Sequence, residues 1–82
     1  MPSIDERMNA IVLKIVRRRS PEADVADFDT AIWDLDLDSL DVAELTELLE
    51  KEFGVEADLE QLDECVSPAD IKAYFQGLIG TP

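Results

Sequence analysis

The feature that most constrains the fold is an apolar pattern with helical spacing, which occurs three times along the chain. No segment shows the alternation of apolar and polar residues that predicts a half-buried strand. The first helical segment runs from about Ile4 to Arg19, with Ser3 as its candidate cap. The last segment opens with Ser67-Pro68-Ala69-Asp70, a strong helix start signal, and ends at Gly80. These patterns predict an all-α fold.

The middle helix is predicted to run from Ser39 to about Phe53, with Ser39 as its N-cap and Gly54 at its end. Its apolar stripe is expected to face the core and comprises Val42, Leu45, Leu49 and Phe53. The opposite side is expected to be exposed and carries Leu40, Glu44, Glu47 and Glu50. Residues 58–62 are expected to add one helical turn. The result is a small bundle of three main helices plus a short fourth.

Residues 20–38 have no sustained period, so we expect a long loop between the first two helices. A loop of this length is either functional or pinned by its own apolar residues. Phe28, Ile32 and Leu35 are expected to anchor this loop to the core. Two roles stay open for Trp33: it covers a bound group near the middle helix, or it anchors the loop, as a lone aromatic residue more often does.

Size and composition exclude several functional classes. A chain of 82 residues makes one domain at most, residues 1–82, with little volume for a deep active site. The sequence has no histidine, the commonest general base and metal ligand, and Cys65 is its only cysteine. We therefore expect neither an enzyme nor a metal site. The apolar runs are too short to cross a membrane, and the N-terminal residues do not form a secretion signal.

The net charge of −13 is unevenly distributed. Residues 1–19 hold five basic and two acidic residues, or +3, whereas residues 20–82 hold two basic and eighteen acidic residues, or −16. The acidic body repels nucleic acid and favours basic protein surfaces, although acidic faces are often merely solvated. The arginines at 17–19 are expected to complement the negative end of the first helix.

The most informative stretch is Asp34-Leu35-Asp36-Leu37-Asp38-Ser39-Leu40-Asp41. Its alternating aspartates match part of a calcium-binding loop, but Ser39 stands where that template needs Gly and Leu45 where it needs Glu. A second interpretation is that Ser39 only caps the helix and the aspartates only solvate the loop. Asp-Ser-Leu taken alone favours this second interpretation, because serine caps are common.

The whole arrangement, a serine at a helix start after a long acidic loop in a small acidic helical domain, resembles the acyl carrier protein family. The resemblance extends from the first helix through Ser67–Phe75. Its motif is Leu35-x-x-Asp38-Ser39-Leu40-Asp41-x-x-Glu44-Leu45, followed by Leu49-Glu50-x-Glu52-Phe53-Gly54-Val55. In that family the serine accepts 4'-phosphopantetheine from coenzyme A. The resemblance implies that Ser39 is the modified residue and that Asp38 assists docking or metal binding when the transferase acts.

The resemblance also implies a function. The chain would be a free-standing, monomeric, cytoplasmic carrier that holds an acyl group as a thioester for a fatty-acid-like, polyketide or other specialised pathway. Its partners would be a phosphopantetheinyl transferase, an acyl-loading acyltransferase or ligase, and a ketosynthase or other enzymes with basic patches. The surface that meets those patches would comprise Leu40, Asp41, Glu44, Glu47 and Glu50. Two alternatives stay open: an aminoacyl or peptidyl carrier of a nonribosomal peptide pathway, and an acidic interaction module that is never modified.

Three positions depart from the family pattern and indicate a specialised carrier. Asp36 stands at a usual Gly position, Glu47 stands where an apolar contact residue is frequent, and Lys51 interrupts the acidic face. If the acyl chain lies between helices, its cleft would be lined by Val42, Leu45, Leu49, Ile71 and Phe75. Apolar stripes of this kind are more often plain core, which is the interpretation that we favour.

Overall fold

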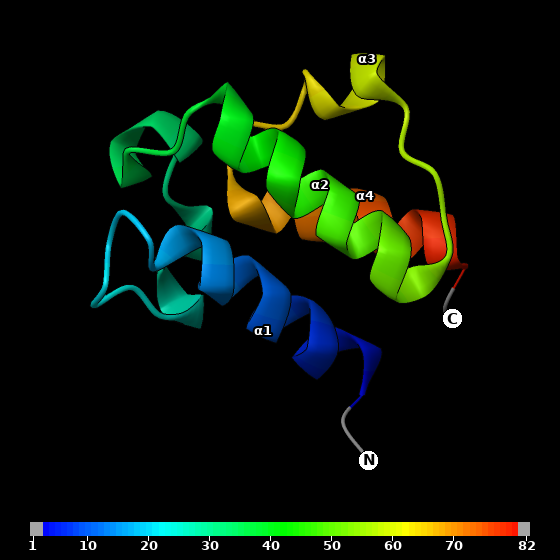
Figure 1. The fold of residues 1–82 in the computed structure, drawn as a ribbon, viewed down its shortest axis with the longest axis horizontal. Coiled ribbons are helices and arrows are strands. Elements are labelled where there is room, and N and C mark those ends of the chain that lie inside the picture. The colour runs from blue at the N-terminus through cyan, green and yellow to red at the C-terminus, as the bar shows by residue number, and fades with distance from the viewer. Residues whose placement is uncertain (1–2, 81–82) are drawn as a thin grey trace.

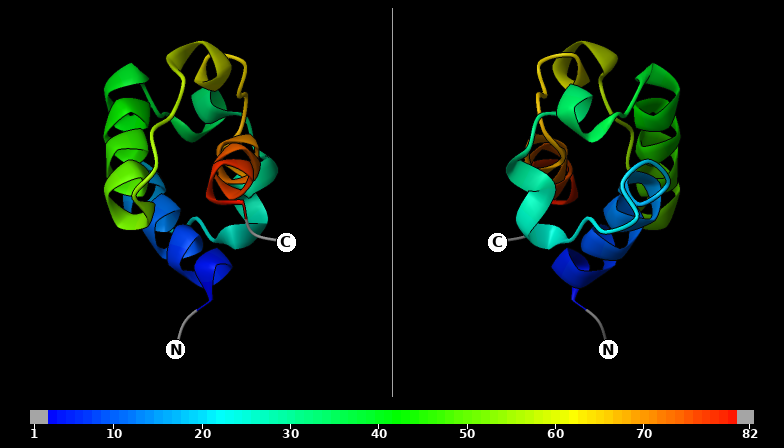
Figure 2. Two further views of the ribbon diagram at one scale, coloured as in Figure 1. Left: turned by 90° about the vertical axis from the view of Figure 1, so that its right-hand side faces the viewer. Right: turned by 90° about the vertical axis from the view of Figure 1, so that its left-hand side faces the viewer.

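Three long helices pack around one core in the computed structural model, which describes residues 3–80 (Figure 1). The helices are α1 (Ile4–Val16), α2 (Ser39–Phe53), α3 (Leu59–Leu62) and α4 (Pro68–Ile79). The described part of the chain contains no strand. Figure 2 shows α2 and α4 on two sides of the bundle, with α1 on a third side. The predicted all-α bundle of three main helices and a short fourth is confirmed.

The helix ends follow from the local sequence. The Ser3 side chain accepts a hydrogen bond from the Glu6 N–H at 3.1 Å, and Ser67 and Asp70 form the capping box that opens α4. Gly54 ends α2 in the left-handed conformation, with φ of 65°. The first helix is shorter than predicted: it ends at Val16, because the N–H groups of Arg18 and Arg19 bond to carbonyls three residues back and tighten the last turn.

The core is built from the facing stripes of the long helices. The side chains with at most 1% exposure in this cluster are Met8, Val12, Ile15, Val16, Leu45, Leu49, Ile71 and Phe75. Full burial of one such side chain contributes about 1.5–3 kcal/mol. The helices therefore have a fixed arrangement, which in turn fixes the position of the N-terminal end of α2.

The segment between α1 and α2 is more regular than the predicted loop. It contains two short 3₁₀ helices, η1 (Val25–Asp29) and η2 (Ile32–Leu35). Phe28 and Leu35 are buried in the core and Ile32 packs against it, as predicted. Of the two roles left open for Trp33, the favoured one, anchoring the segment, does not hold, because 65% of its surface is exposed. Pinning by the other three residues fixes the backbone and leaves the indole on the surface.

Candidate functional site

Ser39 is the first residue of α2, and the N-cap is Asp38 rather than Ser39 as predicted. The Asp38 carboxylate accepts a hydrogen bond from the Asp41 N–H at 2.9 Å, and the Asp41 carboxylate accepts one from the Asp38 N–H at 3.1 Å. This reciprocal pair caps the helix without any help from serine. The Ser39 side chain is exposed, and no hydrogen bond within the described residues uses its hydroxyl. The hydroxyl is therefore free to react.

The N-terminal end of α2 can accept an anionic group. The N–H groups of Ser39 and Leu40 lie in the first turn and have no acceptor within the part of the chain that the structure describes. The α2 helix has 15 residues, so the positive end of its dipole coincides with these N–H groups. A phosphodiester on the Ser39 oxygen would lie beside them, which is the usual setting for a phosphate at a helix N-terminus. The residues present therefore fit a 4'-phosphopantetheine group.

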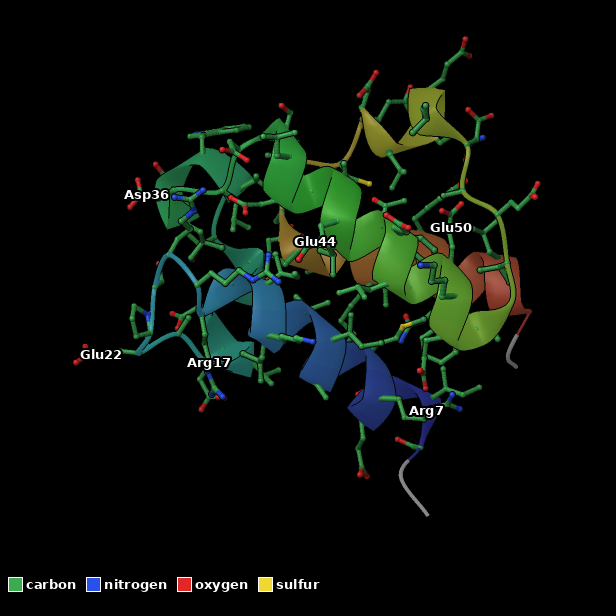
Figure 3. All side chains as sticks on the ribbon, in the orientation of Figure 1. Arg7, Arg17, Glu22, Asp36, Glu44 and Glu50 are labelled. Carbon is green, nitrogen blue, oxygen red and sulfur yellow. The ribbon has the colours of Figure 1, made fainter. Side chains whose placement is uncertain are left out.

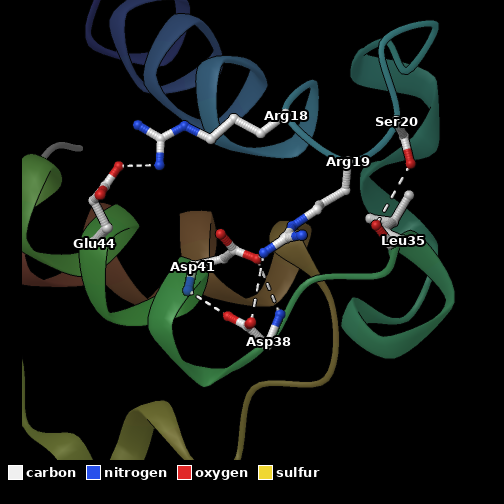
Figure 4. Close-up of polar contacts among 7 residues, drawn as sticks. All are labelled: Arg18, Arg19, Ser20, Leu35, Asp38, Asp41 and Glu44. Carbon is white, nitrogen blue, oxygen red and sulfur yellow. Dashed lines mark hydrogen bonds and ion pairs between the residues drawn. The ribbon is translucent and has the colours of Figure 1, made fainter.

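Two arginines that follow α1 contact the acidic residues of this site (Figure 4). The Arg19 guanidinium lies 3.2 Å from the Asp41 carboxylate and 3.5 Å from the Asp38 carboxylate. Arg18 forms an ion pair with Glu44. These contacts differ from the prediction that the arginines complement the end of α1. Because α1 ends early, the residues that follow it run toward α2. The carboxylates there are stronger partners for a guanidinium than the carbonyl groups at the end of α1.

Asp41 has an internal role. Only 8% of its side chain is exposed. The hydrogen bond from the Asp38 N–H lowers the pKa of Asp41, burial opposes that shift, and Arg19 adds to it. We predicted that Asp41 meets a partner, but the structure turns this carboxylate toward the helix start and Arg19. Asp41 therefore holds Asp38 and Arg19 in place beside Ser39, and its contact with a partner stays a prediction.

The other predicted contact residues occupy different settings on α2. Leu40 is 77% exposed beside Ser39. The Glu47 carboxylate lies 3.2 Å from the Lys51 ammonium, one helical turn further along. Glu50 accepts a hydrogen bond from the Ala57 N–H at 2.8 Å, so it ties α2 to the connection that leads to α3. Figure 3 shows Glu44 and Glu50 at separate positions along the helix, so they do not form one cluster.

A groove of about 470 Å³ opens beside Ser39, between η2, α2 and α3. Its lining includes Ile32, Trp33, Leu37, Asp38, Ser39, Val42, Ala43, Thr46, Glu50, Leu59, Leu62, Asp63 and Cys65. Of the five residues that we considered for an acyl cleft, only Val42 lines this groove, and the other four are buried core residues. Ser39, Val42 and Thr46 follow the spacing of one helical face. The α2 side of the groove was therefore predictable from the sequence.

Trp33 lines the same groove, as its alternative role of covering a bound group requires. No cluster of His, Cys, Asp or Glu side chains among residues 3–80 has the arrangement of a metal site. None of the described helices is both long enough and apolar enough to span a membrane.

Comparisons with known proteins agree with this geometry. A family profile described as a phosphopantetheine attachment site matches residues 10–75. The chain is 34% identical to an acyl carrier protein of Helicobacter pylori (strain ATCC 700392 / 26695) over 73 residues, which cover 89% of this chain and 81% of that protein. It is 35% identical to an acyl carrier protein of Akkermansia muciniphila over 79 residues, 95% of each chain. No solved structure matches.

Proposed function

The chain belongs to the acyl carrier protein family, whose members carry a covalently attached 4'-phosphopantetheine, and from this premise we propose that Ser39 is the attachment residue. The observation that carries the proposal is the exposed Ser39 hydroxyl, which follows Asp38 directly and takes no part in capping α2. When attached, the arm supplies a thiol that holds an acyl group. The protein binds and positions the arm, and the bond making belongs to its partner enzymes.

The residues around Ser39 fix its position. The reciprocal hydrogen bonds between Asp38 and Asp41 hold the first turn of α2, and Arg19 spans both carboxylates. The N–H groups of the first turn can donate to phosphate oxygens. The nearby aspartates repel an added phosphate, and Arg19 offsets part of that repulsion.

Partner enzymes reach Ser39 from the exposed surface around it. The family interacts with a phosphopantetheinyl transferase and with biosynthetic enzymes. Leu40 offers an exposed apolar contact next to the attachment residue, and Asp38 offers a carboxylate that is about half exposed. Long-range attraction between an acidic carrier and basic partners speeds encounter more than it tightens binding, which suits a carrier that must release each partner.

The cargo is proposed to be an acyl intermediate of a specialised pathway, of the fatty-acid-like or polyketide type. The groove beside Ser39 supports acyl cargo, because its lining is largely apolar. An aminoacyl cargo is the alternative. Loading the arm with purified malonyl-transfer and adenylation enzymes separates the two: malonyl loading supports acyl cargo, and aminoacyl loading supports the alternative.

Intact mass of the purified protein tests the attachment residue. The protein is measured before and after incubation with coenzyme A, magnesium and a broad-specificity phosphopantetheinyl transferase. We expect a gain of one phosphopantetheine group that Ser39→Ala abolishes and that the matched Ser20→Ala variant retains. A gain that persists in Ser39→Ala contradicts the assignment, and no gain in an apo protein supports an unmodified interaction module instead.

A further inference from the structure

We propose that the groove beside Ser39 prefers an acyl group that carries a hydroxyl to a plain alkyl group of the same length, and that Thr46 sets this preference. The inference rests on the proposed attachment at Ser39 and deepens it by naming the class of cargo. Ser39 is part of the groove lining, so the attached arm starts there. Thr46 lies seven residues further along α2, about 10 Å along the helix axis. A flexible arm that bends back into the groove brings its cargo to Thr46.

The core offers no ready space for the cargo. The side chains of Leu45, Leu49, Ile71 and Phe75 are at most 1% exposed. They belong to one core cluster, and protein interiors are packed as densely as organic crystals. An acyl chain between them would have to push these side chains apart. The groove is already open, with a volume of about 470 Å³, which lies in the range of small-molecule sites.

Thr46 places one polar atom among the apolar side chains of the groove. Only 6% of Thr46 is exposed, and its neighbours in the lining include Val42 and Ala43 of α2 and Leu62 of α3. The Thr46 hydroxyl donates to the Val42 carbonyl oxygen at 2.8 Å, so its proton is committed. No hydrogen bond among residues 3–80 donates to the Thr46 oxygen. This oxygen can therefore accept a hydrogen bond from a group in the groove.

The other polar side chains of the groove also favour an occupant that brings a donor. The lining includes the carboxylates of Asp38, Glu50 and Asp63, and within the described residues it includes no Lys or Arg. The Cys65 thiol donates to a backbone carbonyl of α3 at 3.8 Å. Once the attachment serine is modified, the indole N–H of Trp33 is the remaining side-chain donor of the described lining. The groove thus offers more acceptors than donors.

A neutral hydroxyl fits this lining better than the other common substituents. A plain alkyl chain would cover the Thr46 oxygen and exclude water without supplying a donor, which is unfavourable. A carboxylate on the cargo would be repelled by the carboxylates of the lining. An ammonium group would lose its hydration beside the buried, neutral Thr46. A hydroxyl supplies one donor and no charge.

Two loaded forms with cargo of equal chain length test the preference. A broad-specificity phosphopantetheinyl transferase installs the loaded arm from β-hydroxyhexanoyl-CoA or from hexanoyl-CoA, and intact mass verifies each form. We expect the hydroxyacyl form of the wild type to melt roughly 3–8 °C higher than the alkyl form, the effect of one hydrogen bond in a domain of this size. Trp33 is the only tryptophan and lines the groove, so its fluorescence emission reports whether the groove is occupied.

Variants of Thr46 assign the preference to its oxygen. Thr46→Val keeps the branched shape and removes the oxygen, so it should abolish or reverse the difference in Tm. Thr46→Ser should retain the difference, as should the matched control Thr30→Val, which lies outside the groove. Equal Tm values for the two loaded wild-type forms, or a difference that persists in Thr46→Val, overturn the inference and leave the attachment at Ser39 intact. Trp33 emission that is identical in loaded and unloaded forms also overturns it, because the groove is then empty. The absence of any mass gain contradicts the proposed function itself.

Discussion

Removing the Asp41 carboxylate should destabilise the protein more than removing the carboxylate of Asp70, which occupies the corresponding position in α4. In Asp41→Ala, the Asp38 N–H loses its acceptor and the Arg19 guanidinium loses its nearer partner, at 3.2 Å. Loss of a capping group costs about 1 kcal/mol, and loss of a partly buried, charge-assisted hydrogen bond adds a similar amount. The expected total is about 2 kcal/mol of unfolding free energy. For a domain of this size that corresponds to roughly 8–16 °C in Tm.

The matched control is Asp70→Ala. Asp70 occupies the same N3 position in the capping box of α4 and accepts hydrogen bonds from the N–H groups of Ser67 and Val66, but it is exposed and has no arginine partner within the described residues. Because Asp70 is exposed, water can take the place of the lost acceptor. We expect Asp70→Ala to lose about 1 kcal/mol of unfolding free energy, or roughly 4–8 °C in Tm. Thermal unfolding followed by circular dichroism measures both. Equal losses, or a larger loss in Asp70→Ala, would refute the argument that burial and Arg19 make the Asp41 carboxylate special.

Three further predictions follow from individual residues. Asp36 has φ of 61°, so Asp36→Gly should raise the unfolding free energy by about 0.5–1 kcal/mol and Asp36→Ala should lower it, as thermal melting will show. The pKa of Asp41 is lowered in the folded state, so the stabilisation by its ionised carboxylate is present above an unfolded-state pKa near 4 and is lost as pH falls through the folded-state pKa. The difference in Tm between wild type and Asp41→Asn should therefore shrink below about pH 4. A difference that stays constant with pH would contradict this. Burial raises the pKa of Cys65, so its reaction with a disulfide reagent at pH 8 should be slower than in the urea-unfolded chain.

The elements that the sequence predicted well are those with local causes. The last helix begins at Pro68 because Ser67 and Asp70 supply a capping box within four residues. The start of α2 was misassigned because Asp38 and Ser39 are both good caps. The third residue after the cap decides between them: it is Asp41 for Asp38, which returns a hydrogen bond, and Val42 for Ser39, which has no acceptor to return one. This distinction was present in the sequence.

The groove and the ion pairs of Arg18 and Arg19 have non-local causes. Arg19 is 22 residues from Asp41 along the chain. Their contact depends on where α1 ends and on how the core orients it against α2, neither of which periodicity specifies. The groove likewise requires η2, α2 and α3 to be placed together. Sequence patterns predicted the helices, and the resemblance to the family pointed to Ser39, whereas packing determines what surrounds that residue.

The cap position has a direct consequence for carrier chemistry. A serine that caps a helix has its oxygen bound to a backbone N–H, and modifying that oxygen would disturb the helix start. Here the Asp38 carboxylate accepts from the Asp41 N–H and the Asp41 carboxylate accepts from the Asp38 N–H, and Arg19 contacts both carboxylates. The helix start therefore does not depend on Ser39, whose side chain lies one residue inside the cap. Attachment and removal of an arm at Ser39 would leave the capping bonds intact, so apo and holo forms should share one fold and differ mainly in the arm.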